Sequence, residues 1–331
     1  MELFTLPFMI RALIAAFLAG LIAPAIGLYI VQRRLALLGD GLGHVAIAGV
    51  GLALATGTAP LPMAVAVCVA GAVIVELLRQ SGKATGDVGL AILFYGGLAA
   101  GVLLTGLSGQ GTGALAQYLF GSLLTLSEAD LWVIVVLGLL VLVPAVGMLP
   151  QLFAATTDEE YARTLGLPVR RYNLLIVVLA AITVTVSMRT VGLLLVSALM
   201  VVPVASASNL LRGFRTTLYG AMGLGVASAL LGVVGSYFGD VAPGSLIVLV
   251  AIGFFAASVP LGSWLGRRRR LSPAIDITDP EPLPHETTEN PHADHVHGPA
   301  CGHLAVVHGD HTDYVHDGHR HAAHDDHYDE H

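Results

Sequence analysis

The chain has 331 residues, of which 55% are hydrophobic and only 12% charged, with a formal net charge of -7. Soluble domains carry roughly 25% charged residues, so an ordinary globular protein is excluded. The 16 Lys and Arg against 23 Asp and Glu leave no basic excess for binding nucleic acid, and two cysteines, Cys68 and Cys301, exclude a disulfide framework.

Charge and histidine are distributed unevenly along the chain. Residues 1–270 hold 15 Lys and Arg and 10 Asp and Glu, whereas residues 271–331 hold one Arg and 13 acids. Of the 14 histidines, 13 lie after residue 284, and His44 alone lies in the apolar body. We therefore expect a transmembrane domain at 1–265, a basic anchor and linker at 266–284, and a disordered His-rich tail at 285–331.

Long apolar runs fill the body of the chain. A membrane-spanning helix needs roughly 20 mostly apolar residues. The sequence therefore predicts an all-α polytopic membrane helix bundle of about nine spans. A further apolar stretch, 114–126, is too short for a confident span and suits a re-entrant or interfacial segment. The predicted spans are 8–31, 36–57, 61–78, 88–107, 130–150, 172–188, 191–211, 216–237 and 244–264.

Basic residues predict the orientation of these spans. Lys and Arg cluster in alternate connections, and cytoplasmic loops are enriched in them. We expect the N-terminus outside, the tail in the cytoplasm, and the protein in the plasma membrane as a multi-pass protein. The basic clusters are Arg33/Arg34, Arg79/Lys83, Arg163/Arg170/Arg171, Arg212/Arg215 and Arg267–Arg270.

Ionisable residues within predicted spans are candidates for function, because a charge at membrane depth is costly. They are Arg11, Asp40, His44, Glu76 and Arg189. Glu76 and Arg189 lie within about one turn of an interface, so side chains that reach the headgroup water explain them.

Asp40 and His44 are four residues apart in LLGDGLGHVAIAGVG. On a helix this spacing places both on one face, about 6 Å apart along the axis. A carboxylate and a neutral imidazole suit zinc, manganese or ferrous iron. Two ligands do not complete a tetrahedral site, so a further partner or water would be needed. A simple Asp–His ion pair is the alternative, and the spacing alone does not decide.

The segment QLFAATTDEEYARTLGLPVRR, residues 151–171, joins the fifth and sixth predicted spans. Thr157 followed by Glu160 fits a capping box, and Gly166 and Pro168 fit a helix stop. These signals predict a short helix at about 158–165 on the cytoplasmic side. It is either an ordinary connector or a docking element for a cytoplasmic partner.

Four stretches of the chain, in order, resemble the permease subunit of the zinc/manganese/iron ABC importer family, zinc-permease type. The resemblance covers about residues 8–264, and the Gly-Asp-x-x-x-His and Tyr-Ala-x-x-Leu-Gly stretches are its most specific parts. The stretches are GLYIVQRRLALLGDGLGHVAIAGVGLAL (27–54), QYLFGSLLTLSEADL (117–131), DEEYARTLGLPVRRYNLLI (158–176) and MRTVGLLLVSALMVVPVASA (188–207).

This resemblance implies a permease that forms a homodimer, couples to a cytoplasmic ABC ATPase and receives metal from an extracytoplasmic binding protein. It implies a role in metal passage for Asp40 and His44. It also implies ATPase coupling by five residues: Glu159, Tyr161, Ala162, Leu165 and Gly166. No phosphate-binding G-x-x-x-x-G-K-[ST] motif is present, so the chain is expected to be a transport subunit and not an enzyme, with ATP bound by the partner. No permanently bound cofactor is expected.

The tail departs from the family pattern. Residues 285–331 carry 13 His, seven Asp and three Glu, a composition typical of metal-binding tracts. We expect the tail to buffer or sense metal. Its composition favours zinc as the ion that the permease imports into the cytoplasm by an ATP-driven process, with manganese or iron as alternatives. The candidate ligands are His292, His295, His297, Cys301, His303, His308, His311, His316, His319, His321, His324, His327 and His331.

Two other functions fit the sequence less well. A secondary metal carrier or exporter would work without an ATPase and would be expected to carry metal-ligand pairs on several spans, whereas the body has one histidine. A membrane metal sensor would use the tail as receptor, but about nine spans exceed what an anchor needs.

Overall fold

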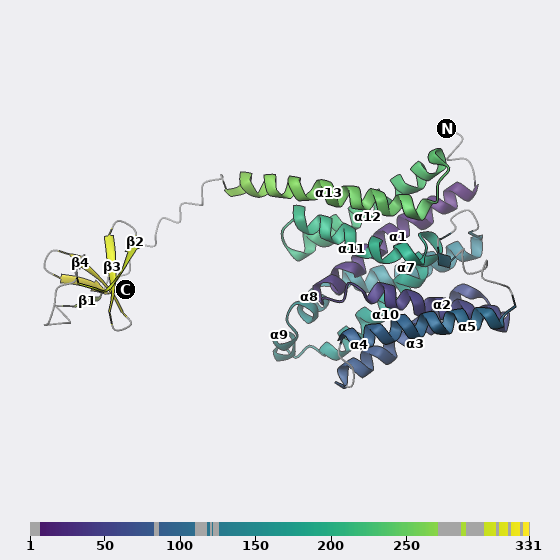
Figure 1. Cartoon of the computed structure of the whole chain (residues 1–331), viewed down its shortest axis with the longest axis horizontal. Helices are drawn as coiled ribbons and strands as arrows, with labels where there is room; N and C mark the ends of the chain where they lie inside the picture. The colour runs from purple at the N-terminus through teal and green to yellow at the C-terminus, as the bar shows by residue number, and fades with distance from the viewer. Residues whose placement is uncertain are drawn as a thin grey trace. The chain divides into compact units, whose positions relative to one another are not determined.

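The computed structural model of the chain describes residues 7–82, 86–109, 118–119, 121, 126–270, 286–288, 301–308, 311–316, 319–324 and 327–330. It divides into two compact units, Met1–Gly266 and Arg267–His331. The first unit is a helical bundle and the second is a small sheet (Figure 1).

The bundle confirms the predicted all-α membrane fold. Eight helical segments are long and apolar enough to cross a membrane, and one shorter apolar helix adds to them in the part of the chain that is described. In lipid a chain must satisfy its backbone polar groups internally, which the helix does. In order, the helices are α1 (Pro7–Gln32), α2 (Leu38–Thr56), α3 (Pro60–Gln80), α4 (Gly86–Ala91), η2 (Ile92–Gly96), α5 (Gly97–Leu107), α7 (Glu128–Gly147), α8 (Leu149–Thr157), α9 (Glu159–Thr164), α10 (Val169–Thr190), α11 (Leu193–Leu210), α12 (Phe214–Gly239) and α13 (Pro243–Arg270).

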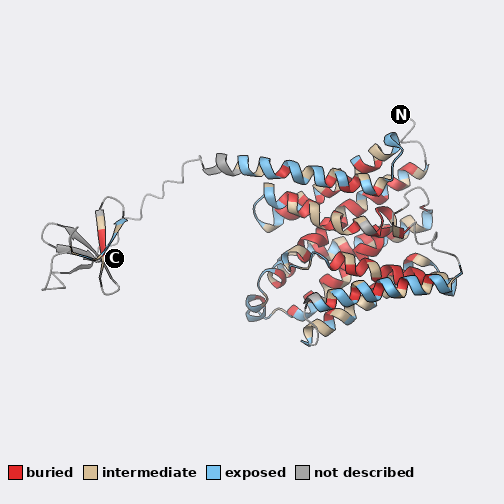
Figure 2. Cartoon of the chain, in the orientation of Figure 1, coloured by how far each residue is buried: buried red, intermediate tan, exposed pale blue. Residues whose placement is uncertain are grey.

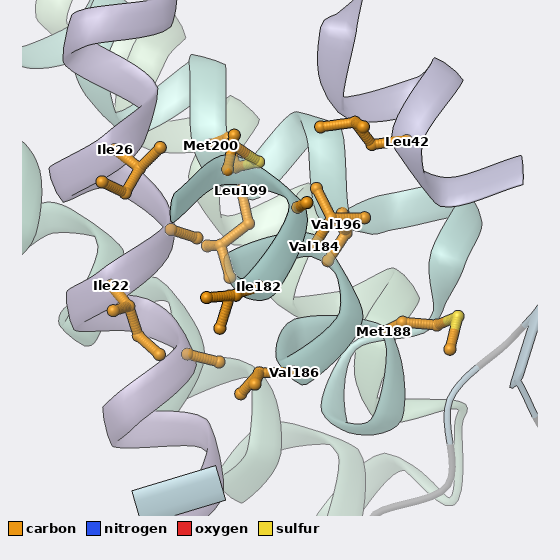
Figure 3. Packing of buried hydrophobic residues seen from close by; sticks show 14 of the residues in the cluster. Ile22, Ile26, Leu42, Ile182, Val184, Val186, Met188, Val196, Leu199 and Met200 are labelled. Atoms are coloured by element: carbon orange, nitrogen blue, oxygen red, sulfur yellow. The ribbon is translucent and has the colours of Figure 1, made fainter. Parts of the chain in front are cut away.

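Helices α1 and α10 form the centre of the bundle. Helix α1 contacts α7, α10, α11 and α12, and α10 also contacts α2 and α3. Figure 3 shows Ile22 and Ile26 of α1 facing Ile182 and Val186 of α10 and Leu199 of α11, and all of these side chains are buried. In contrast, α3, α5, α7 and α13 keep exposed apolar faces (Figure 2), as expected of helices that border lipid.

Glu76, near the end of α3, lies in a buried ion cluster. Its carboxylate accepts two hydrogen bonds of 2.8 Å from Arg79 and one of 3.0 Å from Gln80, and Arg33 lies 3.7 Å away. The side chains of Glu76 and Arg33 are only 3% and 4% exposed. The expectation that Glu76 reaches headgroup water is therefore wrong, because its partners lie within the protein.

The same cluster ties three helix ends together. Arg33 follows the last residue of α1, and Gln80 donates a 3.2 Å hydrogen bond to the carbonyl of Arg170 in the first turn of α10. The cluster therefore holds the ends of α1 and α3 against the start of α10 through contacts within the protein.

At the other end of α10, Arg189 also has a partner within the chain. Its guanidinium lies 3.1 Å from the carboxylate of Asp130 and 5.3 Å from the ring centre of Tyr118. Asp130 in turn forms a capping box with Ser127 at the start of α7. The ion pair joins α7 to α10, and its two side chains are 13% and 24% exposed.

The described part of the tail differs from the expectation of an unfolded segment. Its strands pair antiparallel in the order β1-β5-β4-β3-β2. Tyr314 and the run Leu304–Val307 place apolar residues in these strands. Backbone hydrogen bonds between neighbouring strands also hold the sheet together. The strands are β1 (Glu286–Thr288), β2 (Leu304–His308), β3 (His311–His316), β4 (His319–His324) and β5 (His327–Glu330).

We predict that Glu76→Ala lowers the free energy of unfolding by about 3 kcal/mol, because it leaves the buried Arg33 without its carboxylate. Glu128→Ala is the matched control, since Glu128 is an exposed acid in the first turn of α7 and its loss should cost less than about 1 kcal/mol. Denaturant unfolding of the detergent-solubilised protein measures both. Equal losses in the two variants would contradict the role of the cluster.

Candidate functional site

Helix α2 carries both predicted metal-pathway residues and is packed closely on several sides. It contacts α3, η2, α5, α10 and α11. At Gly97, a Cβ atom would lie 2.6 Å from the amide nitrogen of Val45 and 2.7 Å from the carbonyl carbon of His44. The absence of a side chain at residue 97 thus lets α5 begin directly against the backbone that carries His44.

Asp40 and His44 lie in the first two turns of α2, and both are partly exposed. Asp40 lines a surface groove of about 310 Å³. The rim of this groove is apolar and open, because Leu37 and Tyr95 are 67% and 70% exposed. The residues that line it are Leu37, Asp40, Leu90, Ala91, Phe94 and Tyr95.

The ring of His44 is held in a defined orientation. Its Nδ1 atom lies 2.7 Å from the backbone carbonyl oxygen of Asp40, and since a carbonyl only accepts, Nδ1 must donate. In a neutral ring the Nε2 lone pair is then available as a metal ligand. The ring also packs against Phe94, with the ring centres 4.1 Å apart.

The alternative of an Asp40–His44 ion pair does not match the structure. The contact of the imidazole is with the carbonyl of Asp40, and none of the ion pairs among the described side chains joins the two residues. Nor do the described residues contain a group of three or more His, Cys, Asp or Glu close enough to hold a metal ion. One chain therefore supplies an incomplete ligand set here.

Sequence reasoning missed the aromatic residues beside His44. Phe94 and Tyr95 lie on η2, a π-helix of five residues within the predicted span 88–107. Short π-helical turns are rare and occur often at functional sites. The sequence signal is weak, because the ILFYGG run is apolar throughout and shows no break where the helix changes its geometry.

The predicted docking helix is present as α9, with a different capping residue. The side chain of Asp158 accepts a 2.9 Å hydrogen bond from the amide of Tyr161, whereas Thr157 is the last residue of α8. The expected cap at Thr157 is therefore wrong, because α8 continues through this residue. Gly166 has a φ of +76°, and the amides of Gly166 and Leu167 bond to the carbonyls of Arg163 and Ala162 in a Schellman ending.

The five predicted coupling residues divide into buried and exposed groups. Ala162 is fully buried with Ala155 and Val169. Tyr161 and Leu165, one turn apart, are 60% and 56% exposed. The helix is thus anchored through one face and presents two large apolar side chains on another.

Glu159 connects α9 to the bundle. It accepts a 2.8 Å hydrogen bond from Asn173, a buried residue of α10. It also forms an ion pair with Arg163, with a distance of 3.2 Å between the nitrogen and the oxygen. The hydrogen bond from Asn173 would therefore transmit a movement of α9 to the start of α10.

The predicted tail ligands are only partly covered by the structure. His292, His295, His297 and His331 lie outside the described residues. Cys301 and His303 precede β2 and are partly exposed. The remaining predicted ligands occupy strand positions: His308, His311, His316, His319, His321, His324 and His327.

Comparison with known proteins identifies relatives of the helical unit. The family model described as the ABC 3 transport family matches residues 5–261. The manganese transport system membrane protein MntC of Halalkalibacterium halodurans is 35% identical over 256 residues, which are 77% of this chain and 87% of that protein. The manganese import system permease protein ScaB of Streptococcus gordonii is 29% identical over 251 residues, 76% of this chain and 90% of its own.

A solved structure agrees with these relatives. PsaBC from Streptococcus pneumoniae, determined in complex with a Fab, superposes with a TM-score of 0.72 and 28% sequence identity. The match covers 80% of this chain and 97% of the PsaBC chain. The residues after 261 lie beyond the family match.

We predict that Gly97→Ala destabilises the protein by about 1–3 kcal/mol, since the added methyl group meets backbone that has no free space. The neighbouring Gly96→Ala is the matched control, because no atom lies within 4 Å of a Cβ placed at Gly96. Thermal unfolding in detergent should show a lower midpoint temperature for Gly97→Ala than for the parent protein. The midpoint of Gly96→Ala should be unchanged. A Gly97→Ala protein as stable as the parent would refute the close contact.

Proposed function

The chain belongs to the ABC 3 transport family, and from this premise we propose that Asp40 and His44 contact the metal ion on its way through the membrane. The chain is a multi-pass permease subunit of a metal ABC importer. It is not an enzyme, and ATP hydrolysis resides in a separate chain. The observation that carries the proposal is the placement of Asp40 beside an open groove, with His44 one turn further and oriented by a bond through Nδ1.

Manganese is the first cargo to test. Two relatives are named for manganese transport, and a site of one carboxylate and one imidazole suits manganese as well as iron or zinc. Zinc is the second candidate, favoured by the histidine content of the tail.

A second copy of the chain would complete the site. Asp40 and His44 supply two ligands, fewer than a stable metal site needs. The apolar rim formed by Leu37 and Tyr95 is a suitable contact surface for a homodimer, in which two Asp40–His44 pairs would face each other. Weak, shared ligation would also allow the ion to be released.

Helix α9 is proposed to dock the ATPase. Tyr161 and Leu165 are the exposed apolar contacts, while Glu159, Ala162 and Gly166 hold the helix in place. Closure of the ATPase would move α9 and, through the Glu159–Asn173 bond, the start of α10. The bundle halves would then rock as rigid bodies between outward-open and inward-open states.

The distribution of basic residues supports an orientation with α9 and the tail in the cytoplasm of the cell and the opposite face toward an extracytoplasmic metal-binding protein. The tail would then meet imported metal, which it would buffer or sense through its histidines. The plasma membrane is the proposed location.

We predict that His44→Ala and Asp40→Ala each reduce uptake of manganese at least about tenfold, since each removes one of two ligands that the chain offers. Glu128→Ala, which removes an exposed acid at a helix end, should transport normally. Uptake of radioactive manganese and zinc into cells or vesicles that contain equal amounts of each variant measures the effect. Parental uptake of both metals by the His44→Ala protein would overturn the proposed pathway.

We predict that the double variant Tyr161→Ala/Leu165→Ala weakens ATPase association by more than about tenfold, because two apolar side chains no longer bury surface. The control is Leu107→Ala/Phe238→Ala, which removes exposed apolar side chains elsewhere on the bundle. Co-purification of the ATPase with each permease variant provides the readout. If the control loses the ATPase to the same degree, α9 is not the docking element.

A further inference from the structure

The histidines of the tail follow an eight-residue repeat. From residue 292 the sequence reads HADHVHGP, ACGHLAVV, HGDHTDYV, HDGHRHAA and HDDHYDEH. Position 4 of every unit is His, and position 1 is His in four of the five. In the last three units the two residues between these histidines are Gly or Asp only, the residues that two-residue strand connections favour.

This repeat matches the spacing of the strands. His308 ends β2 and His311 begins β3, while His324 ends β4 and His327 begins β5. Because β2, β3, β4 and β5 are consecutive antiparallel neighbours, these four strand ends lie at the same end of the sheet.

The register aligns the four positions in one row. His308 is the pairing partner of His311, and His324 is the partner of His327. The β3–β4 pairing places Asp313 opposite Ala322, and the same register continued by two residues places His311 opposite His324. Directly opposed residues share a face of the sheet, so His308, His311, His324 and His327 occupy one row across four strands on one face.

Other histidines of the sheet occupy different positions. His316 and His319 pair with each other at the opposite end of β3 and β4. His316 is five residues from His311, an odd number, so it belongs to the opposite face. The row of four is therefore a feature of the register and does not follow from histidine content alone.

The chemistry of such a row favours late transition metals. Opposed residues of neighbouring strands have Cβ atoms about 4.5–5.5 Å apart, close enough for adjacent imidazoles to share an ion. Imidazole suits zinc and copper, and affinity for divalent ions rises from manganese toward copper and zinc. Asp313, fully buried and two residues from His311, places a carboxylate position on the same face in the next row.

We propose that the His308–His311–His324–His327 row is a metal site of the folded tail that binds zinc in preference to manganese. The inference deepens the proposed metal-binding role of the tail and rests on it. It assigns that role to one row of the sheet instead of to all 13 histidines. A permease that imports manganese would thereby carry a cytoplasmic sink for the competing ion.

The test uses the full chain in detergent with Asp40→Ala and His44→Ala already in place, so that the proposed pathway site does not contribute. In this background one variant changes all four row histidines to Gln. The matched control changes His303, His316, His319 and His321 to Gln, so that both lose four histidines. Zinc and manganese are titrated separately by calorimetry against each protein.

We expect the row variant to bind zinc at its tightest site more than about 100-fold more weakly, given that loss of only an outer-shell partner costs roughly 10–100-fold. The control should retain that site, and manganese should bind all proteins weakly. Equal losses of zinc affinity in both variants would overturn the proposal that the row is the site. The tail would then bind metal through histidines that are not confined to this row. Retention of the tightest zinc site by both variants would overturn the proposal as well. Failed manganese uptake by His44→Ala proteins bears only on the transport proposal.

A second pair of variants distinguishes the loss of a metal site from unfolding of the sheet. With Cys301 changed to Ser, we introduce His311→Cys and His324→Cys together, which the register places opposite each other. Cobalt should then give a thiolate charge-transfer absorption from two sulfur ligands on one ion. Cysteines at His311 and His316, on opposite faces, should not give the two-sulfur signal. The same signal from both pairs would contradict the row.

Discussion

Among the described residues, helix α2 packs against six other helical segments, and this packing constrains what Asp40 and His44 can do. The helix start of α5 lies directly against the backbone of His44 because residue 97 is glycine. Asp40 lines an open groove, and His44 lies one turn further along the same helix. A carboxylate in that position within a membrane requires water, a cation or a second protein surface. Each of these is compatible with the proposed metal pathway.

Two other acids of the bundle have ion-pair partners within the chain. Glu76 is neutralised by Arg79 and Arg33, and Asp130 by Arg189. For Asp40 no ion pair is found in the part of the chain that the structure describes. This contrast separates two acids that stabilise helix ends from Asp40, which we propose is available to a transported cation.

Local sequence signals predicted the helices well and their polar contacts poorly. The nine apolar runs correspond to nine helical segments among the residues that the structure describes, because the requirement to satisfy backbone groups in lipid leaves few other structures. Arg33, one partner of Glu76, and Asp130, the partner of Arg189, lie 43 and 59 residues away in the chain, so no local pattern reveals these two contacts. The N-cap of α9 is Asp158 and not the predicted Thr157. Both residue types suit the N-cap position, but α8 extends through Thr157. In the tail, the histidine content alone did not reveal the eight-residue repeat. Strand pairing was needed to show which histidine positions lie opposite each other.

The proposed contact between His44 and the transported metal can be tested directly by spectroscopy. His44 is the only histidine before residue 285, and the helical unit is compact without the tail. X-ray absorption of the protein truncated after Arg270, assembled with its ATPase and loaded with manganese or zinc, should detect imidazole nitrogen in the metal's first shell. A metal bound by oxygen ligands alone, with a spectrum that His44→Ala leaves unchanged, would show that His44 does not contact the ion.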